Sequence, residues 1–200
     1  MSEELDSETA RARRLACLDA SHMTALNSYA EGLRAEGRDV PWFDSVDGGT
    51  AARCLILLER PARRGHAPRF VSCDNPAPAQ RNLRRFLAES GLQRRRMVLW
   101  NAVPWLPPAD TVRNTPPRAA ELRAGLARLP ALLDLLPALQ VVVLAGRAAE
   151  RAAPLCAVPV VRVPHPSPVY VNAVPSARGR IVAGLSEAAS KIECRTTGRH

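Results

Sequence analysis

The chain has 200 residues, 46% of them hydrophobic, which suits one compact domain with a buried core and excludes a coiled coil or a disordered protein. Its net charge of +9 and pI near 10.5 favour an anionic partner such as nucleic acid, because arginine-rich surfaces attract polyphosphates. No apolar run reaches the roughly 18 to 20 residues of a membrane-spanning helix, and residues 1–8 are acidic and polar, unlike a secretory signal. We therefore expect a soluble, cytoplasmic protein with no membrane partner.

The five cysteines are scattered along the chain, and no Cys-x-x-Cys pair occurs. An odd number of cysteines without an export signal argues against a disulfide framework. The spacing also lacks the ligand pattern of a zinc or iron–sulfur site. We therefore expect no metal and no cofactor.

The N-terminal part of the chain has a helical pattern between residues 7 and 34, which predicts one or two helices packed outside a sheet. Glycine and aspartate then interrupt the pattern in residues 41–49, which predicts an ordered loop. We expect an N-terminal helical segment (1–40) packed on an α/β domain (41–193), followed by a flexible tail (194–200). The apolar positions of the helical pattern are Leu15, Leu18, Leu26, Tyr29 and Leu33.

Four short apolar runs follow, and continuous runs of this length are typical of strands buried on both faces of a parallel sheet. Helical spacing lies between and after them, in residues 83–87, 122–133 and 181–192, with Pro130 expected to kink or restart the second helix. The alternation predicts a three-layer α/β/α sandwich around a mostly parallel four-stranded sheet. The runs are Cys54–Leu58, Met97–Trp100, Val141–Leu144 and Val160–Val163.

Three of the four predicted strands end in polar or proline-stiffened sequence: Glu59-Arg60-Pro61, Asn101 and Pro164-His165-Pro166-Ser167-Pro168. Ligands of such sheets bind at the carboxyl ends of the strands. Proline fixes its own φ and drives the preceding residue towards extended geometry, so the last segment holds an imidazole and a hydroxyl in place. The pair suits an anion or a phosphate.

These strand-end motifs, together with Phe70 and Ala62, resemble the uracil-DNA glycosylase superfamily in order and spacing, over roughly residues 41–185. The match is to the branch with a Glu-x-Pro first motif and a His-Pro-Ser-Pro second motif. The resemblance implies a base-excision repair enzyme, a monofunctional hydrolase that cuts the N-glycosidic bond of a flipped deaminated base, above all uracil. It also implies single- or double-stranded DNA as the partner of a monomer.

The resemblance assigns roles to individual residues. Phe70 would stack on the base, and the Asn101 amide would read the uracil edge by donating and accepting at once, which rejects cytosine. His165 would stabilise the negative charge that builds on the base as the bond breaks. Ser167, Pro61 and Pro168 would contact the DNA phosphates and backbone, and the next residues, Val169 or Tyr170, would wedge into the base stack.

The group that activates water is the point at which this chain departs from the family. Some branches place an aspartate where this chain has Arg60, and an arginine cannot act as a base at neutral pH. Glu59 and Asp74 are the remaining candidates. Strand alternation would turn Glu59 away from the pocket, so we favour Asp74 on geometry.

Two other functions stay open at this stage. The first is a catalytically inactive DNA- or partner-binding protein of the same fold, in which Arg60 has replaced the catalytic group. The second is an α/β enzyme that acts on nucleotides or other small anions.

Overall fold

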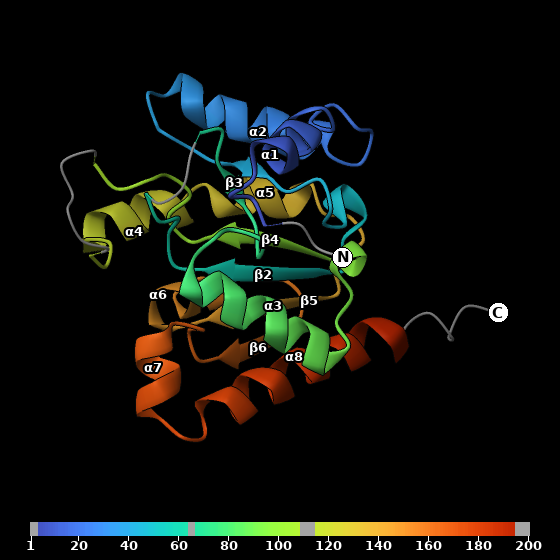
Figure 1. Ribbon diagram of the computed structural model, residues 1–200, viewed down its shortest axis with the longest axis vertical. Helices are drawn as coiled ribbons and strands as arrows, with labels where there is room; N and C mark the ends of the chain where they lie inside the picture. Colours follow the sequence, from blue (N-terminus) through green and yellow to red (C-terminus); the bar gives the residue numbers. More distant parts are fainter. Residues whose placement is uncertain (1–3, 64–66, 109–114, 195–200) are drawn as a thin grey trace.

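The computed structural model describes residues 4–63, 67–108 and 115–194, and its centre is a four-stranded, fully parallel sheet with the strand order β4-β2-β5-β6 (Figure 1). This confirms the predicted mostly parallel sheet, and the predicted strands agree with the observed ones to within one residue at each end. The strands are β2 (Cys54–Leu58), β4 (Met97–Asn101), β5 (Val141–Ala145) and β6 (Val160–Val163).

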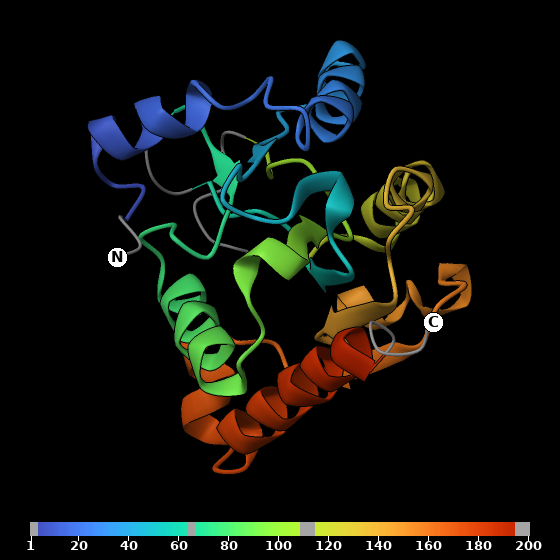
Figure 2. The same ribbon diagram turned by 90° about the vertical axis from the view of Figure 1, so that its right-hand side faces the viewer.

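Helices cover both faces of the sheet, as the α/β/α prediction required (Figures 1 and 2). The helices α3 (Pro78–Ser90) and α8 (Ala177–Cys194) pack together on one face, and α5 (Leu129–Asp134) lies on the other. Pro130 stands at the start of α5, directly after α4 has ended, so the predicted restart is confirmed. The other helical elements are α1 (Glu8–Leu15), α2 (Thr24–Ala35), α4 (Ala119–Leu126), α6 (Arg147–Glu150), α7 (Pro168–Ala173), η1 (Gly49–Ala51), η2 (Arg94–Arg96) and η3 (Ala153–Leu155).

Burial explains why the apolar runs became strands. Every residue of β2, β4 and β5 is buried, so these continuous runs have helices or neighbouring strands on all sides. The edge strand β6 alternates instead, with Arg162 exposed between two buried valines. The core therefore lies along the sheet, and polar residues first appear where the strands end.

A second sheet of two short parallel strands, β1 (Trp42–Phe43) and β3 (Phe70–Val71), lies beside the main sheet. The sequence predicted only a loop over residues 41–49, because two residues are too few to show an alternating pattern. The Phe43 ring stacks on Trp100 of β4, with 3.9 Å between the ring centroids. This stack ties the small sheet, and with it Phe70, to the main one.

The N-terminal part of the chain forms the two helices α1 and α2, and α2 donates a hydrogen bond from the Tyr29 hydroxyl to the carbonyl of Arg128 (3.0 Å). Cys194 closes α8, and the rest of the expected tail, residues 195–200, lies outside the described residues. Among the helices that the structure describes, none is both long and apolar enough to span a membrane.

Candidate functional site

A small cavity, called here the inner cavity, opens where β2 and β4 end. Phe70 and Asn101 line it, together with Pro61 and Ala62 from the loop after β2 and Gln80 from α3. The structure therefore brings together the two residues that the sequence assigned to base binding, although they lie on different sheets.

Phe70 is held firmly in the wall of the inner cavity. Its position in β3 opposite Trp42 sets its backbone, and the Asn75 side-chain amide donates a hydrogen bond to its carbonyl (2.8 Å). Phe70 as a whole is 3% exposed, and it packs against Leu5 and Ala10. A ring fixed in this way offers a preformed stacking face.

Asn101 is the last residue of β4 and lies opposite Leu58 of β2. Beyond the strands, the Ala102 N–H donates to the Leu58 carbonyl (2.8 Å) and keeps the two chains aligned. The Asn101 side chain is buried, and its amide has no hydrogen-bond partner among the residues that the structure describes. Because Asn101 lines the inner cavity, this amide is available to a ligand there.

A larger, more open cavity, called here the outer cavity, adjoins the inner one. Glu59, His165, Ser167 and Pro168 line it. Three residues, Ala62, Ala77 and Gln80, belong to the walls of both cavities. The two cavities are therefore neighbours, and a ligand that fills the inner one can extend into the outer one.

His165 has a defined tautomer. The backbone N–H of Ser167 donates to its Nδ1 (3.2 Å), which places the ring proton on Nε2. Burial lowers the pKa of His165 below its ordinary value of 6.5, so the ring is neutral at pH 7. The loop is held from α3, where the Asn82 amide donates to the Pro166 carbonyl (3.0 Å).

The ring of His165 also rests on a glycine. Gly146 has a φ of +90°, and a Cβ placed there would lie 3.0 Å from the Cβ of His165. A side chain at this position would push against the histidine, so the glycine permits the close approach.

Ser167 has a structural role in addition to the one expected. Its hydroxyl oxygen accepts a hydrogen bond from the Tyr170 N–H (3.4 Å) as the N-cap of α7, and Pro168 stands at the first helical position. The hydroxyl hydrogen remains a donor. The next residue, Val169, is 83% exposed, so α7 presents an apolar tip.

Glu59 and Asp74 occupy different environments. Glu59 is half-buried in the wall of the outer cavity, and burial raises its pKa above the ordinary 4.5. Strand alternation therefore does not remove it from the site. Asp74 lines neither cavity, so its placement argues against the preference drawn from the sequence.

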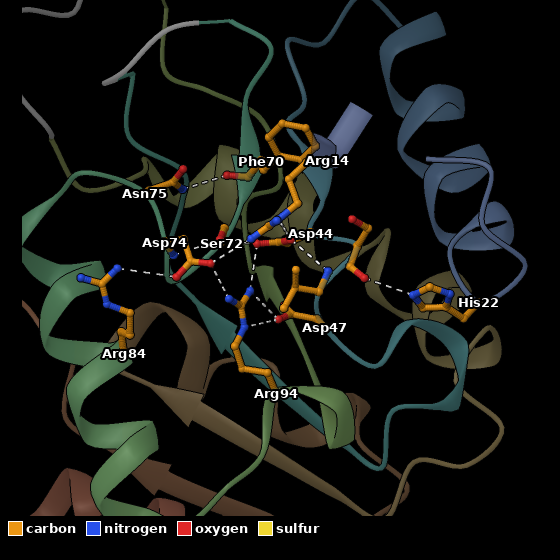
Figure 3. Close-up of polar contacts among 12 residues, drawn as sticks. Arg14, His22, Asp44, Asp47, Phe70, Ser72, Asp74, Asn75, Arg84 and Arg94 are labelled. Atoms are coloured by element: carbon orange, nitrogen blue, oxygen red, sulfur yellow. Dashed lines mark hydrogen bonds and ion pairs between the residues drawn. The ribbon is translucent and has the colours of Figure 1, made fainter. Parts of the chain in front are cut away.

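The reason for this placement is a buried acid–arginine cluster (Figure 3). Asp74 is fully buried, and its carboxylate pairs with Arg14 (3.1 Å) and Arg94. Arg94 also pairs with Asp44 and Asp47, each at 2.8 Å. Four segments that are far apart in the sequence are in contact here, and no local sequence pattern predicts this contact.

Arg60 lies outside both cavities. Its side chain is 4% exposed, and its guanidinium pairs with Glu121 of α4 (3.2 Å). The arginine in the first motif therefore stabilises the contact between a strand-end loop and a helix, and its charge is not part of the site.

The site offers no evident metal ligands. Within residues 4–63, 67–108 and 115–194, no group of three or more His, Cys, Asp or Glu side chains is arranged to hold a metal ion. The donors present are an amide, an imidazole and a carboxylate spread over two cavities, which suits an organic ligand better than an ion.

Comparison with known proteins agrees with this geometry. The family model of the uracil DNA glycosylase superfamily matches residues 46–183, which is more than half of the chain. No curated protein matches the chain.

Proposed function

Because this chain belongs to the uracil DNA glycosylase superfamily, we propose that it is a monofunctional DNA glycosylase that hydrolyses the N-glycosidic bond of a flipped deaminated base, uracil above all. The observation that carries the proposal is the adjacency of the two cavities. Phe70 and Asn101 line the inner one, and His165 lines the outer one. A base fills the inner cavity, while its sugar and phosphates lie in the outer one.

Recognition of the base rests on Phe70 and Asn101. The buried ring stacks on the base, a contact worth about 1 to 3 kcal/mol. The unpartnered Asn101 amide donates to a carbonyl and accepts from the ring N–H of uracil. Cytosine presents an amino group and a bare ring nitrogen instead, which reverses the donor and acceptor that uracil offers, so an amide held in the uracil-binding orientation discriminates against it.

Bond cleavage places negative charge on the base. The electrons of the bond between the sugar C1′ and the base nitrogen remain with the base, and the Nε2–H of His165 donates a hydrogen bond to the resulting anion. A neutral imidazole fixed by Ser167 supplies this donor without reorganisation, and such donors are commonly worth about 3 kcal/mol.

Glu59 completes the hydrolysis. A water molecule in the outer cavity attacks C1′, and its proton passes to the Glu59 carboxylate. The raised pKa makes Glu59 a stronger base than an exposed glutamate, provided that it is ionised. We assign water activation to Glu59 because Asp74 is engaged by arginines away from the cavities.

The outer cavity suits the DNA backbone. The hydroxyl of Ser167 and the rigid Pro168 contact the phosphates and sugars there, Pro61 contacts the backbone from the wall of the inner cavity, and the exposed Val169 wedges into the base stack. Basic side chains line the same cavity, and they neutralise further phosphates. These are Arg147, Arg162 and Arg180. We propose that the protein acts on DNA as a monomer in the cytoplasm.

Loss of catalysis, the alternative that the sequence left open, drew its support from Arg60. Arg60 instead pairs with Glu121 and lines neither cavity, which speaks against this alternative. DNA binding without excision is then an outcome of the test rather than a second proposal.

The test is release of base from single- and double-stranded oligonucleotides that carry uracil, hypoxanthine or no lesion. We expect uracil release, reduced about a hundredfold or more in His165→Ala and at least about tenfold in Asn101→Ala. Gln93→Ala removes an exposed amide outside both cavities and should release uracil like the wild type. The proposal fails if the wild type binds DNA but releases no base, or if the two site variants match it.

A further inference from the structure

The inner cavity has a wall that comes from outside the part of the chain matched by the family model. Leu5 and Arg11 line the cavity, whereas the family match begins at residue 46. Leu5 is 4% exposed and packs against Phe70, the ring that the base would meet. The N-terminal segment, residues 4–15, therefore contributes directly to the wall of the inner cavity.

Several contacts anchor this segment. The Arg14 guanidinium pairs with Asp44 (2.7 Å) and Asp74 (3.1 Å), both fully buried carboxylates in the acid–arginine cluster (Figure 3). The Leu5 N–H donates to the Asp74 carbonyl (2.9 Å), and Glu4 pairs with Arg84 of α3 (2.9 Å). The pairs of Arg14 with the two buried carboxylates hold the segment in one position, because breaking a buried pair leaves a charge uncompensated.

The lining of the inner cavity is positively charged. It includes two arginines, Arg11 and Arg69, and no aspartate or glutamate among the described residues. Arg11 uses its Nη1 to donate to the carbonyls of Leu5 (3.0 Å) and Asp6 (2.7 Å), and no partner is described for its other N–H groups. The Nε of Arg69 is buried and lacks a partner in the described part of the chain. Guanidinium donors at a cavity wall favour a ligand that supplies acceptors.

We propose that residues 4–15 form a base-selecting wall of the inner cavity, in which Leu5 shapes the space beside Phe70 and Arg11 favours bases that present carbonyl oxygens. The inference rests on the proposed function and deepens it. A guanidinium donates and never accepts, so at the C4 edge of the base it pairs with the carbonyl of uracil and opposes the amino group of cytosine. The same charge stabilises the base anion as the glycosidic bond breaks.

The experiment measures binding of free uracil and free cytosine by ligand-observed NMR, which needs no catalysis, and uracil release in parallel. We expect Arg11→Gln to weaken uracil binding about tenfold with little change for cytosine, and Arg11→Lys to restore part of the loss. Leu5→Ala should weaken the binding of both bases to a similar extent, because it removes an apolar contact surface and no hydrogen-bond donor. Arg123→Gln removes an exposed arginine from α4 and serves as the matched control.

Circular dichroism and affinity for undamaged DNA show whether each variant remains folded, and Arg11→Lys keeps the inference testable if Arg11→Gln unfolds. The inference is overturned if folded Arg11 variants keep the wild-type preference for uracil over cytosine. A wild type that binds uracil selectively through Arg11 but releases none supports the inference and overturns the proposed function alone. A wild type that neither binds nor releases uracil overturns both.

Discussion

The backbone N–H of Ser167 donates a hydrogen bond to Nδ1 of His165 across 3.2 Å, two residues away in a proline-stiffened turn. The contact requires an unprotonated Nδ1, and so it favours the neutral ring with its proton on Nε2. Protonation would put a donor against a donor and break the contact. The local turn and the charge state of the histidine are therefore coupled.

This coupling predicts a dependence on pH. The folded-state pKa of His165 lies below the ordinary 6.5, so the unfolded state takes up the proton first as the pH falls. The stabilising contribution is complete above 6.5 and is lost as the pH drops towards the folded-state pKa. NMR titration of the imidazole should give a midpoint below 6.5, with uracil release falling at the same midpoint. A midpoint above 6.5 would contradict the assignment.

Gly146→Ala should reduce both stability and uracil release. Gly146 has a φ of +90° and a ψ of 167°, a region that costs a residue with a Cβ roughly 1 to 3 kcal/mol. The added methyl group also meets the Cβ of His165 at 3.0 Å. Gly179→Ala is the matched control, because Gly179 lies in α8 with no atom within 4 Å of an added Cβ. That change should raise the free energy of unfolding by about 0.5 kcal/mol and leave uracil release unchanged. Thermal unfolding and single-turnover kinetics test both.

Glu59→Gln and Asp74→Asn should have opposite profiles. Glu59 is half-buried at the outer cavity, so its amide variant should lose about a hundredfold or more in uracil release with little change in stability. Asp74 is a fully buried partner of Arg14 and Arg94, so its variant should lose about 3 to 5 kcal/mol of unfolding free energy. Urea unfolding separates the two cases. If Glu59→Gln retained wild-type release, water activation would have to be assigned elsewhere.

Asp47 should make the protein less stable as the pH rises. One of its carboxylate oxygens accepts from Arg94 (2.8 Å), while the other is buried without a partner in the described residues. Burial raises the pKa of Asp47 to about 8, from 3.8. Between these values the folded state holds a proton that the unfolded state has lost, so the free energy of unfolding decreases with increasing pH.

Asp47→Asn removes this titration and should flatten the slope. The measurement is urea unfolding at a series of pH values for both proteins. Equal slopes would show that another group is responsible.

Arg60→Gln should affect stability and spare catalysis. The Arg60 side chain is 4% exposed and pairs with Glu121 outside both cavities, so its loss should cost about 1 to 3 kcal/mol of unfolding free energy. Uracil release by the folded variant should stay close to the wild-type rate. A large gain or loss of release at unchanged stability would mean that Arg60 acts on the site directly. The double variant Arg60→Gln/Glu121→Gln measures the pair itself.

Local physics explains what could be predicted from the sequence. The run Cys54–Leu58 is apolar throughout because neighbours cover both faces of β2, and Pro130 ends one helix and starts another because it lacks an N–H. The prolines of the segment 164–168 restrict the backbone on both sides of His165, and so they predicted that this histidine is held in one position. Each of these features depends on a few consecutive residues.

Partners far apart in the sequence decided the rest, and only the tertiary structure revealed them. Asp74 belongs to a cluster with Arg14 and Arg94, and Arg60 belongs with Glu121, although nothing in the spacing of these residues marks them as pairs. The wall that Leu5 adds beside Phe70 joins residues 65 positions apart. Apolar residues recur with the period of a helix or strand, but the positions of ion-pair partners follow no such period. The partner of a charged residue is the opposite charge that folding brings near it. Such contacts therefore cannot be predicted from the sequence alone.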